Sequence, residues 1–128
     1  MQVHMTKMLP IAARTATTSS DEYENTWERG ILIIVNGTVW ASDPLPQVTP
    51  KIQAYDPIAK EYFDYWIAAA ALTAVGRATY LIHPTVLAGA VGSITEGVKL
   101  PLPAKWKLVM THGSAEAVTY SVSAHKFV

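Results

Sequence analysis

The segments KWKLVMT (Lys105–Thr111) and VTYSVSAH (Val118–His125) decide the fold class of this chain. Each segment alternates apolar and polar side chains with a period of two, which is the pattern of a strand with one buried face. The apolar positions are Trp106, Leu108 and Met110 in the first segment, and Val118, Tyr120, Val122 and Ala124 in the second. Turn-forming residues separate the two segments at His112–Glu116, so we predict a hairpin over Lys105–His125.

A second hairpin is predicted over Lys51–Trp66. Ile52 and Ala54 alternate with polar residues, and an aromatic strand-like segment begins at Glu61. Asp-Pro is a common start for a turn, so the turn is placed at Asp56–Lys60.

A third pairing is expected around Gly30–Val35, where five consecutive apolar residues indicate a strand buried on both faces. Asn36-Gly37 follows, and this dipeptide is the strongest short hairpin signal, with Thr38–Ala41 as the returning strand. The stretch Ser42–Pro50 holds three prolines and is predicted to be a loop or an edge.

The remaining segments are less decided by their sequence. Ile67–Ala74 contains four consecutive alanines, which favour a helix, but the segments beside it are strand-like. We therefore expect a strand at Ile67–Ala74. Ala78–Ile82 is predicted to be a strand closed by His83-Pro84, and Thr85–Val98 a short helix or a long loop. Met1–Pro10 is expected to form an extended N-terminal arm.

Together these elements predict an all-β fold, an antiparallel β-sandwich of jelly-roll type. The domain organisation expected is an arm at residues 1–10 and a single sandwich domain at residues 11–128, which fits the length of 128 residues.

Composition restricts the classes of function. Ten basic and ten acidic residues give a net charge of zero, with no basic stripe, so neither a nucleic-acid partner nor an anionic membrane surface is expected. Half of the residues are hydrophobic and only 16% are charged, against an average of about 25%, which indicates apolar surface available to a protein partner. There is no cysteine, no stretch of signal-peptide type, and no apolar run long enough to span a membrane.

Several groupings resemble catalytic or ligand sites but lack a required feature. His112, Ser114 and Glu116 lie within one tight turn, where they cannot converge as a triad does. The glycine spacing of residues 92–97 suits a phosphate loop, but Val98 stands where that loop needs lysine. The acidic residues near the Lys51–Trp66 turn are expected to solvate it, and the histidines lack ligand spacing. We therefore expect no enzyme activity, no metal and no cofactor.

Aromatic residues are the more informative set, because tyrosine and tryptophan are enriched at interfaces. Tyr55, Tyr62 and Tyr65 flank the turn of the Lys51–Trp66 hairpin and are predicted interface residues, although stacking on a sugar would use the same side chains. Leu87, Val91 and Ile94, in the apolar stretch Thr85–Val98, are predicted to add further contacts.

The order of short motifs along the chain resembles a family of small head proteins of tailed bacteriophages. The motifs are Ala12–Ala16, Gly30 with its following strand, Lys51–Pro57, Glu61–Asp64, Ala69–Gly76, Tyr80–Pro84, Leu102–Leu108 and Thr119–Ser123. They cover roughly Ile11–Val128 and are structural in kind.

This resemblance implies a capsid decoration, or cement, protein on the outer surface of the virion. Its implied partner is the major capsid protein, its implied oligomeric state a homotrimer, and no catalytic residues come with it. Two alternatives stay open: another virion component, such as a tail, connector or head fibre, and a carbohydrate-binding β-sandwich module.

Overall fold

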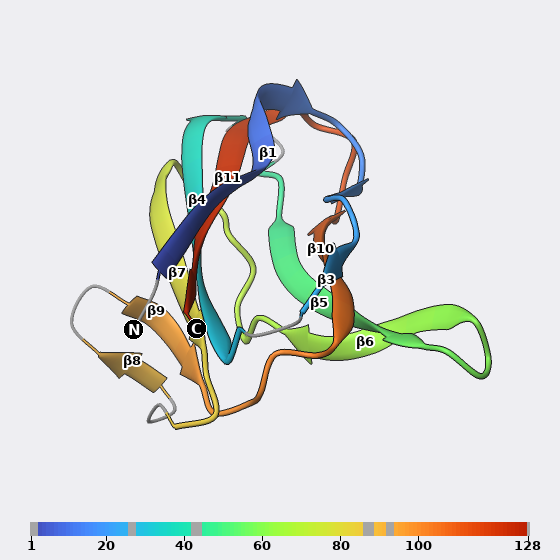
Figure 1. Cartoon of the computed structure of the whole chain (residues 1–128). Coiled ribbons are helices and arrows are strands. Elements are labelled where there is room, and N and C mark those ends of the chain that lie inside the picture. The colour runs from blue at the N-terminus through green and yellow to red at the C-terminus, as the bar shows by residue number, and fades with distance from the viewer. Residues whose placement is uncertain (1–2, 26–27, 42–44, 86–88, 92–93, 128) are drawn as a thin grey trace.

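A computed structural model describes residues 3–25, 28–41, 45–85, 89–91 and 94–127. In this part of the chain the regular elements are strands, arranged in two sheets that face each other (Figure 1). The strands are β1 (Val3–Arg14), β2 (Thr18–Ser19), β3 (Tyr23–Glu24), β4 (Gly30–Trp40), β5 (Val48–Asp56), β6 (Glu61–Ile67), β7 (Gly76–Ile82), β8 (Gly89–Val91), β9 (Ile94–Val98), β10 (Lys105–His112) and β11 (Val118–Phe127). The predicted all-β sandwich is confirmed, and its jelly-roll type stays a prediction.

One sheet has six strands in the order β1-β11-β4-β7-β9-β8. The other has the order β2-β10-β5-β6, and β3 also pairs with β10. Pairing is antiparallel except between β7 and β9, which run parallel. The chain passes through β8 between β7 and β9, and no sequence pattern predicted their parallel pairing.

The core lies between the two sheets and is built from alternate residues of their inner faces. Trp106, Leu108 and Met110 of β10 are at most 1% exposed, as are Val118, Tyr120 and Val122 of β11. All belong to one cluster of buried side chains. Burial of a side chain of this size contributes about 1.5–3 kcal/mol, so these two strands anchor the sandwich.

The predicted Lys105–His125 hairpin is wrong, although both of its strands are present. β10 lies between β5 and the short strands β2 and β3, whereas β11 lies between β1 and β4 in the opposite sheet. Alternation shows which face of a strand is buried, but not which strand lies beside it. The two apolar faces meet across the core, and the connection at residues 113–117 passes from one sheet to the other.

The N-terminal stretch expected to be an arm is, from Val3 onward, the first part of β1. Its pairing with β11 runs from Val3 opposite Phe127 to Arg14 opposite Val118. Met8 and Leu9 are buried in the core, and shifts in register on both sides of Leu9 allow these neighbours to be buried together. Burial of this apolar pair favours a docked strand over a free arm.

The Asn36-Gly37 hairpin prediction is also wrong, because β4 continues through both residues. A tight hairpin of that type needs positive φ at both positions, and the described residues with positive φ are Lys60 and Gly76. Gly37 instead makes room for Trp40, since a Cβ there would lie 3.2 Å from the Trp40 ring. Glycine serves here for close packing and not for a turn.

The Ser42–Pro50 prediction is wrong over its last three residues, which belong to β5, an inner strand. Pro50 pairs with Met110 on the β10 side, while its carbonyl accepts a hydrogen bond from Ala68 N at 3.0 Å on the other side. The missing N–H of proline points to the same side as its carbonyl, where β6 has ended, so the ladder with β10 is intact.

Two further segments differ from expectation. The predicted strand at Ile67–Ala74 is a loop after Ile67, which contains an isolated β-bridge between Leu72 and Val48. The predicted helix or loop at Thr85–Val98 contains strands β8 and β9, and residues 86–88 and 92–93 lie outside the described part.

The Lys51–Trp66 hairpin is confirmed as β5 and β6 with its turn at residues 57–60.

Glu96 of β9 joins the two sheets. Its carboxylate accepts hydrogen bonds from Trp66 Nε1 at 3.0 Å and from Ala69 N at 2.8 Å, both at the end of β6. Trp66 packs edge-on against Tyr80 of β7, and burial, followed by the charge of Glu96, raises the pKa of Tyr80 to about 12. These contacts fix the end of β6 from which the hairpin projects.

Gly30 provides a test of this packing. A Cβ at Gly30 would collide with the carbonyl oxygen of Ile82 and lie 2.6 Å from Cδ2 of His83, where β4 passes β7. We predict that Gly30→Ala lowers the free energy of unfolding by about 1–3 kcal/mol, measured by urea denaturation.

Gly113→Ala is the matched control, because a Cβ there would make only an ordinary contact at 3.5 Å with Gln47 O. Its expected effect is within about 0.5 kcal/mol. Equal stability of the two variants would contradict the packing of β4 against β7.

Candidate interaction surface

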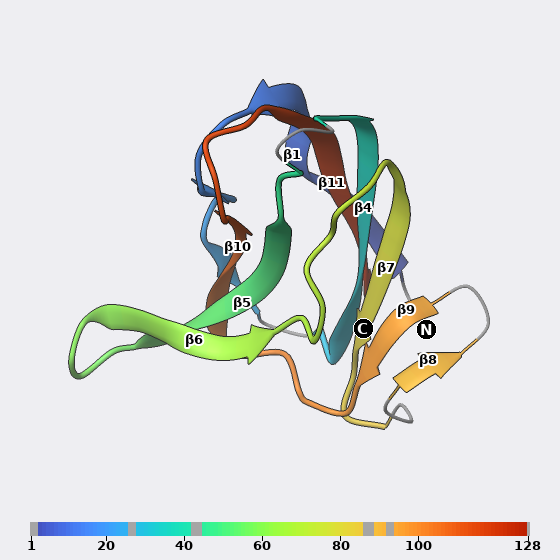
Figure 2. The same cartoon turned by 180° about the vertical axis from the view of Figure 1, so that it is seen from behind.

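The β5–β6 hairpin extends beyond the body of the sandwich, on the side away from β4 and β7 (Figures 1 and 2). Asp56 organises its turn: Oδ1 accepts hydrogen bonds from the backbone N of Ile58 at 2.9 Å and of Ala59 at 3.2 Å. Lys60 closes the turn with positive φ and a hydrogen bond from its N to Asp56 O. The turn places Ile58 at the tip with 92% of its side chain exposed.

The outer face of β10, β5 and β6 carries lysines over tyrosine rings, and we call it the Lys–Tyr face. Its members are Lys51, Gln53, Tyr55, Tyr62, Asp64, Lys105 and Lys107. Lys105 Nζ lies 4.3 Å from the ring centroid of Tyr55, and Lys107 Nζ lies 4.5 Å from that of Tyr62. The two rings meet edge-on with centroids 5.1 Å apart. Each cation–π contact contributes about 0.5–1 kcal/mol at an exposed site. These contacts therefore add little to the stability of the protein, and their main effect is to hold the lysine and tyrosine side chains in fixed positions.

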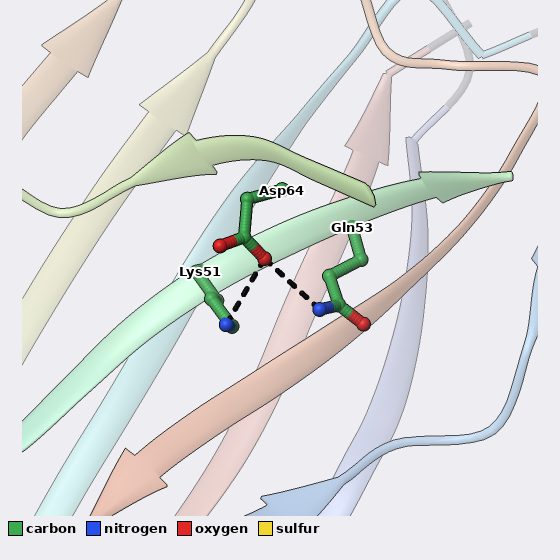
Figure 3. A network of polar contacts seen from close by, with 3 residues as sticks. All are labelled: Lys51, Gln53 and Asp64. Carbon is green, nitrogen blue, oxygen red and sulfur yellow. Dashed lines mark hydrogen bonds and ion pairs between the residues drawn. The ribbon is translucent and has the colours of Figure 1, made fainter. Parts of the chain in front are cut away.

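A polar network continues this face toward the body of the sandwich. Asp64 Oδ1 accepts a hydrogen bond from Gln53 Nε2 at 2.9 Å and lies 3.0 Å from Lys51 Nζ (Figure 3). The hydrogen bond from Gln53, followed by that from Lys51, lowers the pKa of Asp64. Exposed ion pairs contribute about 0–1 kcal/mol, so the network chiefly sets the positions of these side chains.

Glu22 adds a carboxylate at the other end of the Lys–Tyr face. It lies 3.6 Å from Lys105 Nζ, on the connection between β2 and β3. Burial, followed by the charge of Glu22, raises the pKa of Tyr62, so this phenol is neutral at physiological pH. The face therefore presents tyrosine rings, which are enriched at protein interfaces, among lysine and carboxylate groups, which are depleted there.

Tyr65 is separated from the other two predicted interface tyrosines. Strand alternation already places Tyr65, three residues after Tyr62, on the opposite face of β6, and a bulge opposite Ile52 and Gln53 lets Trp66 face the same side. The Tyr65 hydroxyl donates a hydrogen bond to Pro101 O at 2.6 Å. Tyr65 packs against the core cluster, so its role in this structure is packing. The sequence pattern gives no sign of the bulge.

Phe63 is an exposed residue that sequence reasoning missed. It lies opposite Ala54 on the inner face of the hairpin, yet its side chain is 50% exposed because the hairpin extends past the facing sheet. Ile58 lies in the turn and Phe63 in the third residue pair from it, and we call these two exposed side chains together the apolar tip of the hairpin. The strand pattern predicts burial at this position, and only the tertiary arrangement shows otherwise.

The second predicted contact region lies elsewhere. β8 and β9 form a corner of the six-stranded sheet distant from the hairpin tip in both views (Figures 1 and 2). Val91 pairs through its backbone with Ile94, which is half-buried, and Leu87 lies outside the described residues. The predicted interface residues that the structure describes therefore do not form one surface.

The residues considered for chemistry are also dispersed. Asp56 caps the turn and Asp64 contacts Lys51 and Gln53, so these two carboxylates have structural partners. Within residues 3–25, 28–41, 45–85, 89–91 and 94–127, no group of three histidine or acidic residues has metal-binding geometry. No described helix is long and apolar enough to cross a membrane.

His112 has a defined environment at the end of β10. Its Nε2 is 2.8 Å from the hydroxyl of Tyr120, and the guanidinium carbon of Arg14 lies 4.6 Å from the centre of the Tyr120 ring. The other ring nitrogen, Nδ1, is buried without a hydrogen-bond partner among the described residues. Burial, followed by the positive charge of Arg14, lowers the pKa of His112.

This environment predicts a pH dependence of stability. Below the ordinary histidine pKa of 6.5 the unfolded chain binds a proton at His112 before the folded chain does. The free energy of unfolding should therefore fall as pH drops through 6.5, until it reaches the lowered pKa. We predict that His112→Gln reduces this fall, as measured by urea denaturation at several pH values between about 5 and 8.

His4→Gln is the control, since His4 is exposed on β1. It should leave the pH profile unchanged. An identical profile for His112→Gln and the parent protein would show that His112 titrates alike in the folded and unfolded chains.

Comparison with known proteins shows neither a family nor a function for this chain. No protein-family model matches the chain, and no curated protein matches it. Among solved structures, a chain from the structure of infectious bursal disease virus, Gx strain, is similar with a TM-score of 0.48 and 12% sequence identity. The match covers 98% of this chain and 33% of that chain, so the present protein spans about a third of its length. Similarity at this level carries no functional argument.

Proposed function

We propose that this protein is a structural component of a virion that decorates the capsid. In this role it binds the outer surface of the lattice of the major capsid protein and stabilises the head. The observation that carries the proposal is the projecting β5–β6 hairpin with its exposed apolar tip. The order of motifs that resembles phage head proteins supports the same role.

The hairpin has the features of a docking element. Ile58 and Phe63 are 92% and 50% exposed. A partner that covers these apolar side chains removes their surface from water, which favours binding. The capped turn and the Lys–Tyr face hold the backbone and the neighbouring side chains in place before binding, which reduces the entropy lost on association. Full burial of one such side chain contributes about 1.5–3 kcal/mol.

Repetition would convert this modest contact into stable attachment. A homotrimer presents three hairpins to a symmetric lattice, and linked contacts act together through a high effective concentration. Each bound subunit then stabilises the assembled shell by mass action. Size-exclusion chromatography with light scattering tests the trimer, whose mass is three times the chain mass of 13.9 kDa.

A carbohydrate-binding module is the alternative that uses Tyr55 and Tyr62. One face of each ring carries a lysine ammonium group, so a sugar would stack on the other face or displace the lysine. A glycan array with the parent protein and Tyr62→Ala separates this function from decoration. Glycan binding lost in Tyr62→Ala would favour the module.

The decoration function is tested by removing the apolar tip. We predict that Ile58→Ser combined with Phe63→Ser weakens co-sedimentation with capsids of the encoding virus by at least about tenfold, because buried apolar area is lost from the contact. The measurement is the amount of protein bound to purified capsids as its concentration is raised.

Val75→Ser is the matched control, since Val75 is 58% exposed but lies before β7 and not on the hairpin. It should bind as the parent does. Equal binding by the tip variant would exclude the hairpin as the docking element, and no binding by the parent would exclude decoration.

A further inference from the structure

The outer face of the six-stranded sheet contains a polar depression of about 470 Å³. Six side chains line it in two rows across the neighbouring strands β11, β4 and β7. One row is Ser121, Asn36 and Arg77, and the other is Ser123, Ile34 and Thr79. With strands about 4.8 Å apart, each row spans about 10 Å, and the rows lie about 7 Å apart. These dimensions are those of one pyranose ring with its substituents.

The charge of this face differs from that of the whole chain. The four adjacent strands β1, β11, β4 and β7 contain no aspartate or glutamate, although the chain has ten acidic residues. Arg77 lies at one side of the depression, and Lys7 lies beside Ser123 on the opposite side, on β1. Glu96, on the next strand, points into the core. The depression therefore suits a negatively charged ligand.

Four of the polar side chains that line the depression are available to a ligand, while Thr79 Oγ1 accepts a hydrogen bond from Thr95 N. In the described part of the chain, the side chains of Asn36, Arg77, Ser121 and Ser123 form no hydrogen bond or ion pair with another residue. A guanidinium group binds a carboxylate through two parallel hydrogen bonds. The amide and the two hydroxyls match a ligand with several hydroxyl groups, while Ile34 offers an apolar surface to the C–H face of a ring.

We propose that this depression binds an acidic sugar unit of a carboxylate-bearing polysaccharide. Arg77 pairs with the carboxylate, Asn36, Ser121 and Ser123 bind ring hydroxyls, and Lys7 attracts the negatively charged chain. This site is independent of the hairpin and of Tyr55 and Tyr62. It lies on the side of the sandwich away from the hairpin (Figures 1 and 2), so both surfaces are accessible together.

The test is isothermal titration of the full chain with a trisaccharide of galacturonic acid, and with a galactose trisaccharide as the uncharged probe. The acidic probe should bind at least about tenfold more tightly than the neutral one, because the charged hydrogen bonds are lost with the carboxylate. Arg77→Ala should remove this preference, Arg77→Lys should keep part of it, and Ser121→Ala should weaken binding of both probes.

Lys107→Ala, on the opposite sheet, is the control and should bind the acidic probe as the parent does. Three results would overturn the proposal: no binding of the acidic probe, equal binding by Arg77→Ala, or full displacement by an equal concentration of inorganic phosphate, which would indicate a simple anion site. A change of oligomeric mass in Arg77→Ala by light scattering would assign the face to a contact between copies instead. None of these results depends on binding to capsids.

Discussion

The surfaces of this protein depend on the burial of the apolar faces of β10 and β11 against each other. Trp106 and Tyr120, the largest buried side chains of these two strands, are at most 1% exposed and belong to one core cluster. Because the two strands belong to opposite sheets, their alternate residues point outward on opposite sides of the molecule. Lys105 and Lys107 then reach the rings of Tyr55 and Tyr62 on one side, and Ser121 and Ser123 line the depression on the other.

Sequence periodicity predicted the strands of this fold well and their partners poorly. The β5–β6 hairpin was predictable because a proline-containing turn joins two strands that pair directly. The β10–β11 hairpin was not, because alternation is the same whether two strands share a sheet or face each other across a core. The hairpin predicted at Asn36-Gly37 was wrong because glycine is needed there for another purpose. The Trp40 ring leaves little room for a side chain at position 37, so a glycine stands inside a strand and the dipeptide resembles a turn.

The candidate surface was predictable only in part. Tyr55 and Tyr62 were expected at an interface and lie together, whereas Tyr65, three residues after Tyr62 in the same strand, faces the body of the protein by simple alternation. Phe63 was missed because its exposure depends on how far the hairpin extends past the facing sheet, which is a property of the whole fold. The depression at Arg77 also escaped detection, since its six residues come from three strands that are distant in the sequence.

The two proposals assign the hairpin to the capsid, and the outer face of β1, β11, β4 and β7, which have no acidic residue, to the surroundings. Electron cryo-microscopy of virions that carry this protein measures that orientation directly. The account predicts density for the protein over the whole shell, with the β5–β6 tip against the major capsid protein and β4 and β7 facing outward. Density at a single vertex, or a hairpin that points into solvent, would contradict it.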